Sequence, residues 1–105
     1  MFPKGGMGGM VKQAQQMKKK INQVQDELEK LDIEGQSGGG MVKVTVNGKK
    51  DVKSVRIDQN VLNEDVDMVE DLILAAINKA MDNADEISKD KMASLTGGLN
   101  IPGLF

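Results

Sequence analysis

Seven apolar residues between positions 10 and 31 recur at alternating spacings of four and three residues. They are Met10, Ala14, Met17, Ile21, Val24, Leu28 and Leu31. These spacings are those of the a and d positions of a coiled-coil heptad repeat. They predict a helix over about residues 9–31 with a single apolar stripe, which we call the seam.

The length of the seam indicates what it can pack against. A helix of this size is about 30 Å long, whereas a six-residue strand spans only about 20 Å. We therefore expect part of the helix to extend beyond its own sheet and to pack on another helix or subunit. The alternative, a helix that packs only on its own sheet, stays open at this point.

The middle of the chain alternates valines with polar residues, which is typical of half-buried strands. Val42, Val44 and Val46 predict one strand, a second runs over 52–58, and a short strand is possible at 32–37.

Asn47-Gly48 indicates a hairpin between the two valine-bearing strands. A two-residue turn would place Val44 opposite Asp51, a charged residue, on the buried face. A longer loop over 47–52 instead pairs Val44 with Val55 and Val42 with Ile57, which the apolar pattern favours. That register sets two cations, Lys43 and Arg56, opposite each other on the other face.

A second long helix is predicted after a turn at 60–65. Asp67 and Glu70 have the spacing of a capping box, and apolar residues recur from Val69 to Leu95 before Gly97-Gly98 ends the pattern. The expected fold is α+β, with a long helix, a three-stranded antiparallel sheet and a long helix. The 105 residues allow one domain. We assign it to 9–96, between a flexible glycine-rich leader (1–8) and a flexible tail (97–105).

The core that this chain can build is thin. Its only aromatic residues are Phe2 and Phe105, so the core must consist of aliphatic residues and methionine. A thin core divided between long helices is more easily stabilised across a subunit interface. We therefore expect a homodimer with projecting helices.

The composition removes most catalytic chemistry. The sequence has no Cys and no His, so the usual thiol nucleophile, general base and zinc ligands are missing. Gly38-Gly39-Gly40 lacks the context of a phosphate loop, and the carboxylates of 64–71 lack EF-hand spacing. We expect no enzymatic activity, cofactor, metal or small-molecule substrate. No stretch has the length of a bilayer span and the N-terminus lacks a secretory pattern, so a cytoplasmic protein is expected.

Charge is segregated along the chain, although the formal net charge is only −2. Residues 1–25 carry five lysines and no acid, whereas residues 58–90 carry ten acids against two lysines. A phosphate backbone responds to the local face that it meets, so the basic parts are candidates for DNA contact. The candidate set is Lys12, Lys18, Lys19, Lys20, Lys43, Lys53 and Arg56.

The expected mode of DNA binding follows from the aromatic and arginine content of the sequence. No aromatic residues are available to stack bases, which disfavours single strands and RNA. A single arginine allows little bidentate reading of guanine. We expect double-stranded DNA held by its backbone, with low sequence specificity and strong salt dependence. A lysine triplet alone is more typical of a solvated helix face.

Several segments together resemble the YbaB/EbfC family of bacterial nucleoid-associated proteins. They are KQAQQM (12–17), EGQSGGGMVKVTVNG (34–48), VRID (55–58), EDLILAAINKA (70–80) and KMASLTGG (91–98). The resemblance implies a homodimer whose sheets join and whose long helices project like tweezers around duplex DNA. It also implies a place in the nucleoid and roles in altering DNA conformation, nucleoid organisation and gene regulation. The resemblance supplies no active-site motif, and the candidate DNA-binding residues rest on charge and geometry.

Two alternatives belong to other functional classes. The methionine-rich seam and the acidic second helix also fit a coiled-coil-like adaptor or chaperone that holds a protein partner between its helices. An assembly subunit without any ligand is the third possibility.

Overall fold

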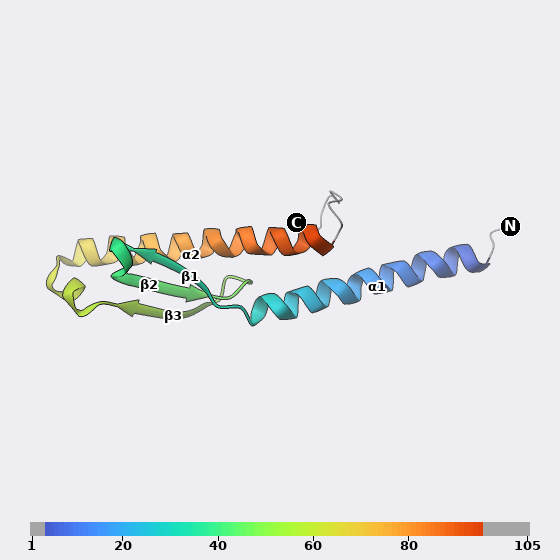
Figure 1. The fold of residues 1–105 in the computed structure, drawn as a ribbon, viewed down its shortest axis with the longest axis horizontal. Coiled ribbons are helices and arrows are strands. Elements are labelled where there is room, and N and C mark those ends of the chain that lie inside the picture. Colours follow the sequence, from blue (N-terminus) through green and yellow to red (C-terminus); the bar gives the residue numbers. More distant parts are fainter. Residues whose placement is uncertain (1–3, 96–105) are drawn as a thin grey trace.

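The computed structural model describes residues 4–95, and side chains from residue 9 onward. Figure 1 shows a long helix, a small sheet and a second long helix, which confirms the predicted α+β class. The elements are α1 (Lys4–Glu29), β1 (Ile33–Ser37), β2 (Val42–Val46), β3 (Val52–Ile57) and α2 (Val66–Leu95), with short 3-10 turns at Gly38–Gly40 and Gln59–Asn63. The predicted tail at 97–105 and the Gly97-Gly98 stop lie outside the described residues.

Both ends of α1 differ from the prediction. The helix begins at Lys4 rather than near residue 9, so residues 4–8, assigned to the leader for their glycine content, continue it. Extending an existing helix adds one hydrogen bond per residue fixed, which outweighs the weak helix propensity of glycine here. At the other end α1 stops at Glu29, and Lys30 N and Leu31 N donate to carbonyls three residues back, as in a tightened last turn.

The sheet has the order β1-β2-β3 with both pairs antiparallel. Val42 pairs with Ile57, Val44 with Val55, and Lys43 with Arg56, as the longer hairpin loop predicted. A bulge between Thr45 and Val46 shifts the register next to the hairpin. The apolar pattern therefore determined the register, and the Asn47-Gly48 pair did not impose a two-residue turn.

The core lies between α2 and two of the three strands. Val42, Val44 and Val46 are fully buried and belong to one cluster with Ala76, Ala80 and Ala84 of α2. The alanines recur every four residues, so they form a stripe of small side chains along one face of the helix.

A glycine on β1 allows this close packing. A Cβ built on Gly35 would lie 2.2 Å from the backbone N of Ala80, so no larger residue fits where β1 crosses α2. β3 has few contacts with α2, and its apolar residues remain exposed by between 37% and 49%.

The start of α2 also differs from the predicted capping box. Val69 N donates to Asp65 O at 3.0 Å, and the helix begins at Val66. Asp67 therefore lies inside the first turn, where its charge still complements the helix dipole, rather than at the N-cap. The predicted turn at 60–65 is largely the 3-10 turn, which is capped by the Asp58 side chain accepting from Asn60 N at 2.8 Å.

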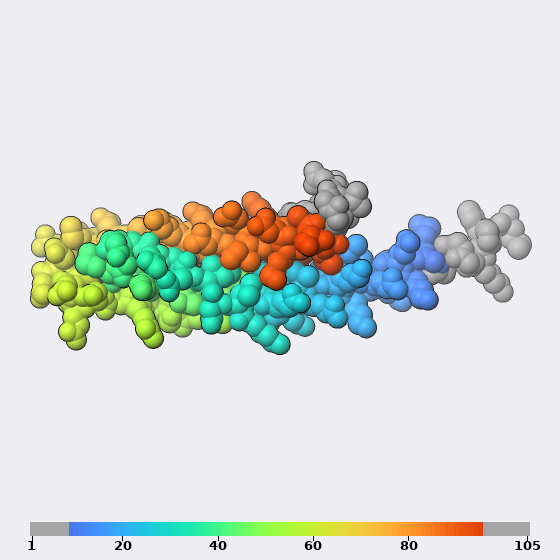
Figure 2. Space-filling view, in the orientation of Figure 1, coloured from blue at the N-terminus to red at the C-terminus, as the bar shows by residue number. Residues whose placement is uncertain are grey.

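The molecule is elongated, with principal-axis extents of 76 × 21 × 17 Å. Figures 1 and 2 show α1 running past the end of α2, as the length of the seam predicted. We call the part of α1 before Leu28 the arm. The exposure of the seam increases along it: Leu28 is buried beside the sheet, whereas Met10 is 72% exposed. No helix within residues 4–95 is long and apolar enough to span a membrane.

Candidate nucleic-acid interface

The direction of α1 relative to the sheet is determined by the packing of its C-terminal end against the β2–β3 hairpin. Gly48 N donates to Leu28 O at 2.7 Å, which satisfies one of the last carbonyls of the helix. A Cβ on Gly48 would lie 2.7 Å from the Leu28 side chain, so only glycine fits here without a shift. Buried Asn47 holds the loop, because its Oδ1 accepts from Lys49 N and Asp51 N, each at 2.9 Å.

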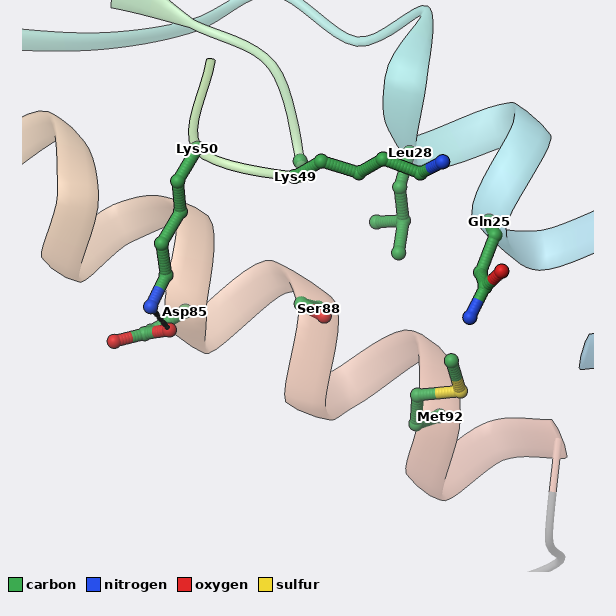
Figure 3. Close-up of a pocket in the computed structure, with 8 residues that line it drawn as sticks. Gln25, Leu28, Lys49, Lys50, Asp85, Ser88 and Met92 are labelled. Carbon is green, nitrogen blue, oxygen red and sulfur yellow. Dashed lines mark ion pairs between the residues drawn. The ribbon is translucent and has the colours of Figure 1, made fainter. Parts of the chain in front are cut away.

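A hollow of about 500 Å³ lies between the hairpin, α1 and α2, and the side chains that line it include Lys49, Lys50 and Asp85. Figure 3 shows Gln25 and Leu28 of α1 opposite Ser88 and Met92 of α2, with the hairpin lysines above. Lys49 pairs with Glu29 at 3.7 Å, Lys91 with Glu27 at 3.5 Å, and Lys50 with Asp85. The cations on this side of α1 are therefore already matched by carboxylates.

The four predicted lysines of α1 are all exposed. Lys12, Lys18, Lys19 and Lys20 form no ion pair with any side chain that the structure describes. Lys12 and Lys19 are seven residues apart and share one face of the helix. Lys19 is two residues from both Met17 and Ile21, so this face is opposite the seam, and Lys18 and Lys20 flank the seam.

The predicted cations of the sheet lie on the face away from α2. Lys43 and Arg56 are cross-strand neighbours, and neither has an ion pair within residues 9–95. Lys53 differs, because its Nζ lies 2.6 Å from Asp32 Oδ1 and donates to Leu31 O at 3.2 Å. The same sheet face has a hollow of about 350 Å³ that is also lined by Glu34.

Six of the seven predicted residues thus form two groups rather than one patch. We call Lys12, Lys18, Lys19 and Lys20 the arm cluster, and Lys43 with Arg56 the sheet pair. Figure 1 shows that the sheet and the arm follow each other along the long axis. The groups therefore occupy different parts of the molecule, and Lys53 between them is neutralised by Asp32.

Sequence patterns did not predict the contact between the β2–β3 hairpin and the end of α1. The Asn47-Gly48 signal indicated a turn, but not that this turn would receive the end of α1. Lys49 and Lys50 lie in the loop between β2 and β3, and their ion pairs link the hairpin to the two helices. Within the described residues, no group of three or more metal-ligating side chains is placed to hold an ion.

Comparison with known proteins places this architecture in a family. The model of the YbaB/EbfC DNA-binding family matches residues 4–99. The chain is 50% identical to the nucleoid-associated protein TTE0040 of Caldanaerobacter subterraneus subsp. tengcongensis, over 99% of this chain and 96% of that protein. Its fold is similar to the crystal structure of the uncharacterized protein HP0035 from Helicobacter pylori, with a TM-score of 0.75, 26% identity, and coverage of 92% of this chain and 100% of that one. The chain belongs to the YbaB/EbfC DNA-binding family.

Proposed function

We propose that this protein binds double-stranded DNA of the bacterial nucleoid as a homodimer, with low sequence specificity. The observation that carries the proposal is a set of exposed cations, the arm cluster and the sheet pair, that have no carboxylate partner among the side chains that the structure describes. The chain that carries them belongs to a DNA-binding family. We further propose that binding alters DNA conformation and serves nucleoid organisation and gene regulation, in the cytoplasm. No cofactor or enzymatic step is part of this function.

Contact with the DNA backbone is the mode that these side chains support. Lysine ammonium groups meet phosphates as point charges, and contacts to phosphates carry no sequence information. The sheet pair adds one guanidinium, and no aromatic side chain lies among residues 4–95 to stack on an unpaired base. The arrangement therefore favours duplex over single-stranded DNA and tolerates different sequences.

A homodimer is supported by apolar surface that a single chain leaves uncovered. Val52 is 49% exposed and Val55 43% exposed, although Val55 is paired with fully buried Val44. On α2, Leu74 is 57% exposed and lines an apolar hollow of about 400 Å³ with Ile73 and Ile77. β3 is also an edge strand with an unpaired side, which a second copy can extend or cover.

The first test compares the affinities of the protein for nucleic acids of equal length. A fluorescent 20-base-pair duplex, its mutated sequences and one of its single strands are titrated and followed by anisotropy. The proposal predicts similar affinity for all duplexes and clearly weaker binding of the single strand. Preference for the single strand, or absence of duplex binding at low salt, would contradict it.

One observation favours the adaptor alternative. The hollow between α1 and α2 is lined by Leu28 and Met92, and adaptable methionine surfaces suit peptide partners. A pull-down from nuclease-treated lysate separates the two functions. A stoichiometric protein partner, together with no affinity for duplex DNA, would replace the DNA-binding proposal.

A further inference from the structure

We infer that duplex DNA lies along the face of the molecule away from α2, with two phosphate contact points about one helical turn of DNA apart. The contact points are Lys12 with Lys19 on α1, and the sheet pair Lys43 with Arg56. This inference rests on the proposed DNA-binding function and specifies which surface performs it.

The first step is the direction of the lysines on α1. The side of α1 that faces α2 is marked by Leu28, which lines the hollow with Met92. Lys19 and Lys12 precede Leu28 by nine and sixteen residues, about 2.5 and 4.5 helical turns, so both point to the opposite side. The lysines most remote from the seam therefore face away from α2.

The second step is the direction of the sheet pair. Val42 and Val44 point into the core against α2, and side chains alternate along a strand. Lys43 therefore lies on the outer face of the sheet, and Arg56 lies beside it across the β2–β3 pair. Adjacent like charges repel each other, and an anion lying over both removes that cost. The sheet pair and the two lysines Lys12 and Lys19 of α1 thus face the same side of the molecule, away from α2.

The third step is the spacing. Lys19 is about 13 Å along the helix from Leu28, and Gly48 is hydrogen-bonded to Leu28 O. Lys43 is about 16 Å along β2 from Gly48. Because the sheet and α1 follow each other along the long axis (Figure 1), Lys19 lies about 30 Å and Lys12 about 40 Å from Lys43. These two values bracket the turn of about 34 Å in B-DNA. Phosphates one turn apart on the same side of a duplex can meet both.

The remaining charges agree with two separate contact points. Between them, Lys53 is neutralised by Asp32, and Glu34 adds a further carboxylate. The gap between α1 and α2 is a poorer site, since Lys50 and Lys91 there already pair with carboxylates. An anionic duplex in that gap would have to displace these pairs, whereas on the outer face it meets cations that have no carboxylate partner within residues 9–95.

The test uses the full-length protein and three double variants at exposed positions, with anisotropy of a labelled 20-base-pair duplex as readout. K12Q/K19Q and K43Q/R56Q each remove one contact point. We expect each to weaken binding about tenfold and to lower the slope of log K against log salt by about two, one for each lost phosphate contact. K79Q/K89Q, which removes two exposed lysines of α2 outside both contact points, is the matched control and should bind as the wild type does.

Duplex length provides an independent readout. A six-base-pair DNA hairpin is about 20 Å long and cannot reach both contact points. With this probe either contact point can hold the DNA alone, so each double variant should lose less than about threefold. A tenfold loss that persists on the hairpin for one variant, with no loss for the other, would overturn the two-point arrangement.

A further variant separates failure of the inference from failure of the function. K18Q/K20Q removes the lysines that flank the seam. If it abolishes duplex binding while K12Q/K19Q and K43Q/R56Q bind normally, the DNA lies on the seam side and the outer-face inference is wrong, although the protein still binds DNA. If the wild type binds no duplex, the proposed function itself fails. Circular dichroism of every variant should match that of the wild type.

Discussion

At the residue scale, two glycines determine how closely the elements approach each other. Gly35 brings β1 against the backbone of α2, and Gly48 brings the hairpin against the end of α1. Neither role could be predicted from sequence, because each depends on which backbone lies opposite the missing side chain. Gly39, by contrast, has a positive φ of 67° and open space around it, so it serves the turn rather than packing.

The packing role of Gly35 leads to a stability prediction. In Gly35→Ala the new Cβ would meet backbone atoms of Ala76 and Ala80, which cannot rotate away. We expect the free energy of unfolding to fall by about 3 kcal/mol, at the upper end of overpacking costs. Gly9→Ala is the control: nothing lies within 4 Å of its Cβ, and alanine in a helix should gain up to about 1 kcal/mol. Urea unfolding measures both, and similar changes in the two variants would contradict the packing argument.

At the scale of elements, the sequence predicted periodic features well and junctions poorly. The order of elements and the β2–β3 register followed from apolar periodicity, because a shift of one residue would have exposed the valines. The predicted start of α1 near residue 9 was wrong, because the low helix propensity of the glycines was given more weight than the extension of an existing helix. The position of the α2 cap was wrong because several acidic residues there have suitable spacing, and only the backbone shows that Val66 begins the helix.

The exposed inner face of β3 gives a prediction about self-association. In Val55→Asp a charge replaces an apolar group that we propose to lie in the dimer interface. We expect the dimer to dissociate at least about tenfold more readily, as burying an unpaired charge costs more than 1.4 kcal/mol. Sedimentation equilibrium measures this change.

The control for this variant is Ser54→Asp, one residue away on the outer face of the same strand. It introduces the same charge and should leave the dimer intact. Equal dissociation of both variants, or a wild type that is monomeric at all concentrations, would contradict the proposed interface.

At the scale of the whole molecule, the acidic and basic segments of the sequence lie on different parts of the structure. The carboxylates of residues 64–90 belong to α2 and the turn before it, while the arm cluster and the sheet pair open elsewhere. The sequence predicted this polarity and the candidate cations. It could not predict that Lys53 is neutralised by Asp32, or that the rest form two groups, since both depend on tertiary contacts between distant segments.

The central claim is that the protein holds duplex DNA through phosphate contacts, and the salt dependence of its affinity tests this most directly. The dissociation constant of the wild-type protein for a 20-base-pair duplex should be measured from 50 to 200 mM KCl. Counterion release from several phosphates predicts that the affinity falls at least about a hundredfold over this range, with a linear log–log plot. An affinity that is independent of salt, or no measurable binding at 50 mM, would contradict the account.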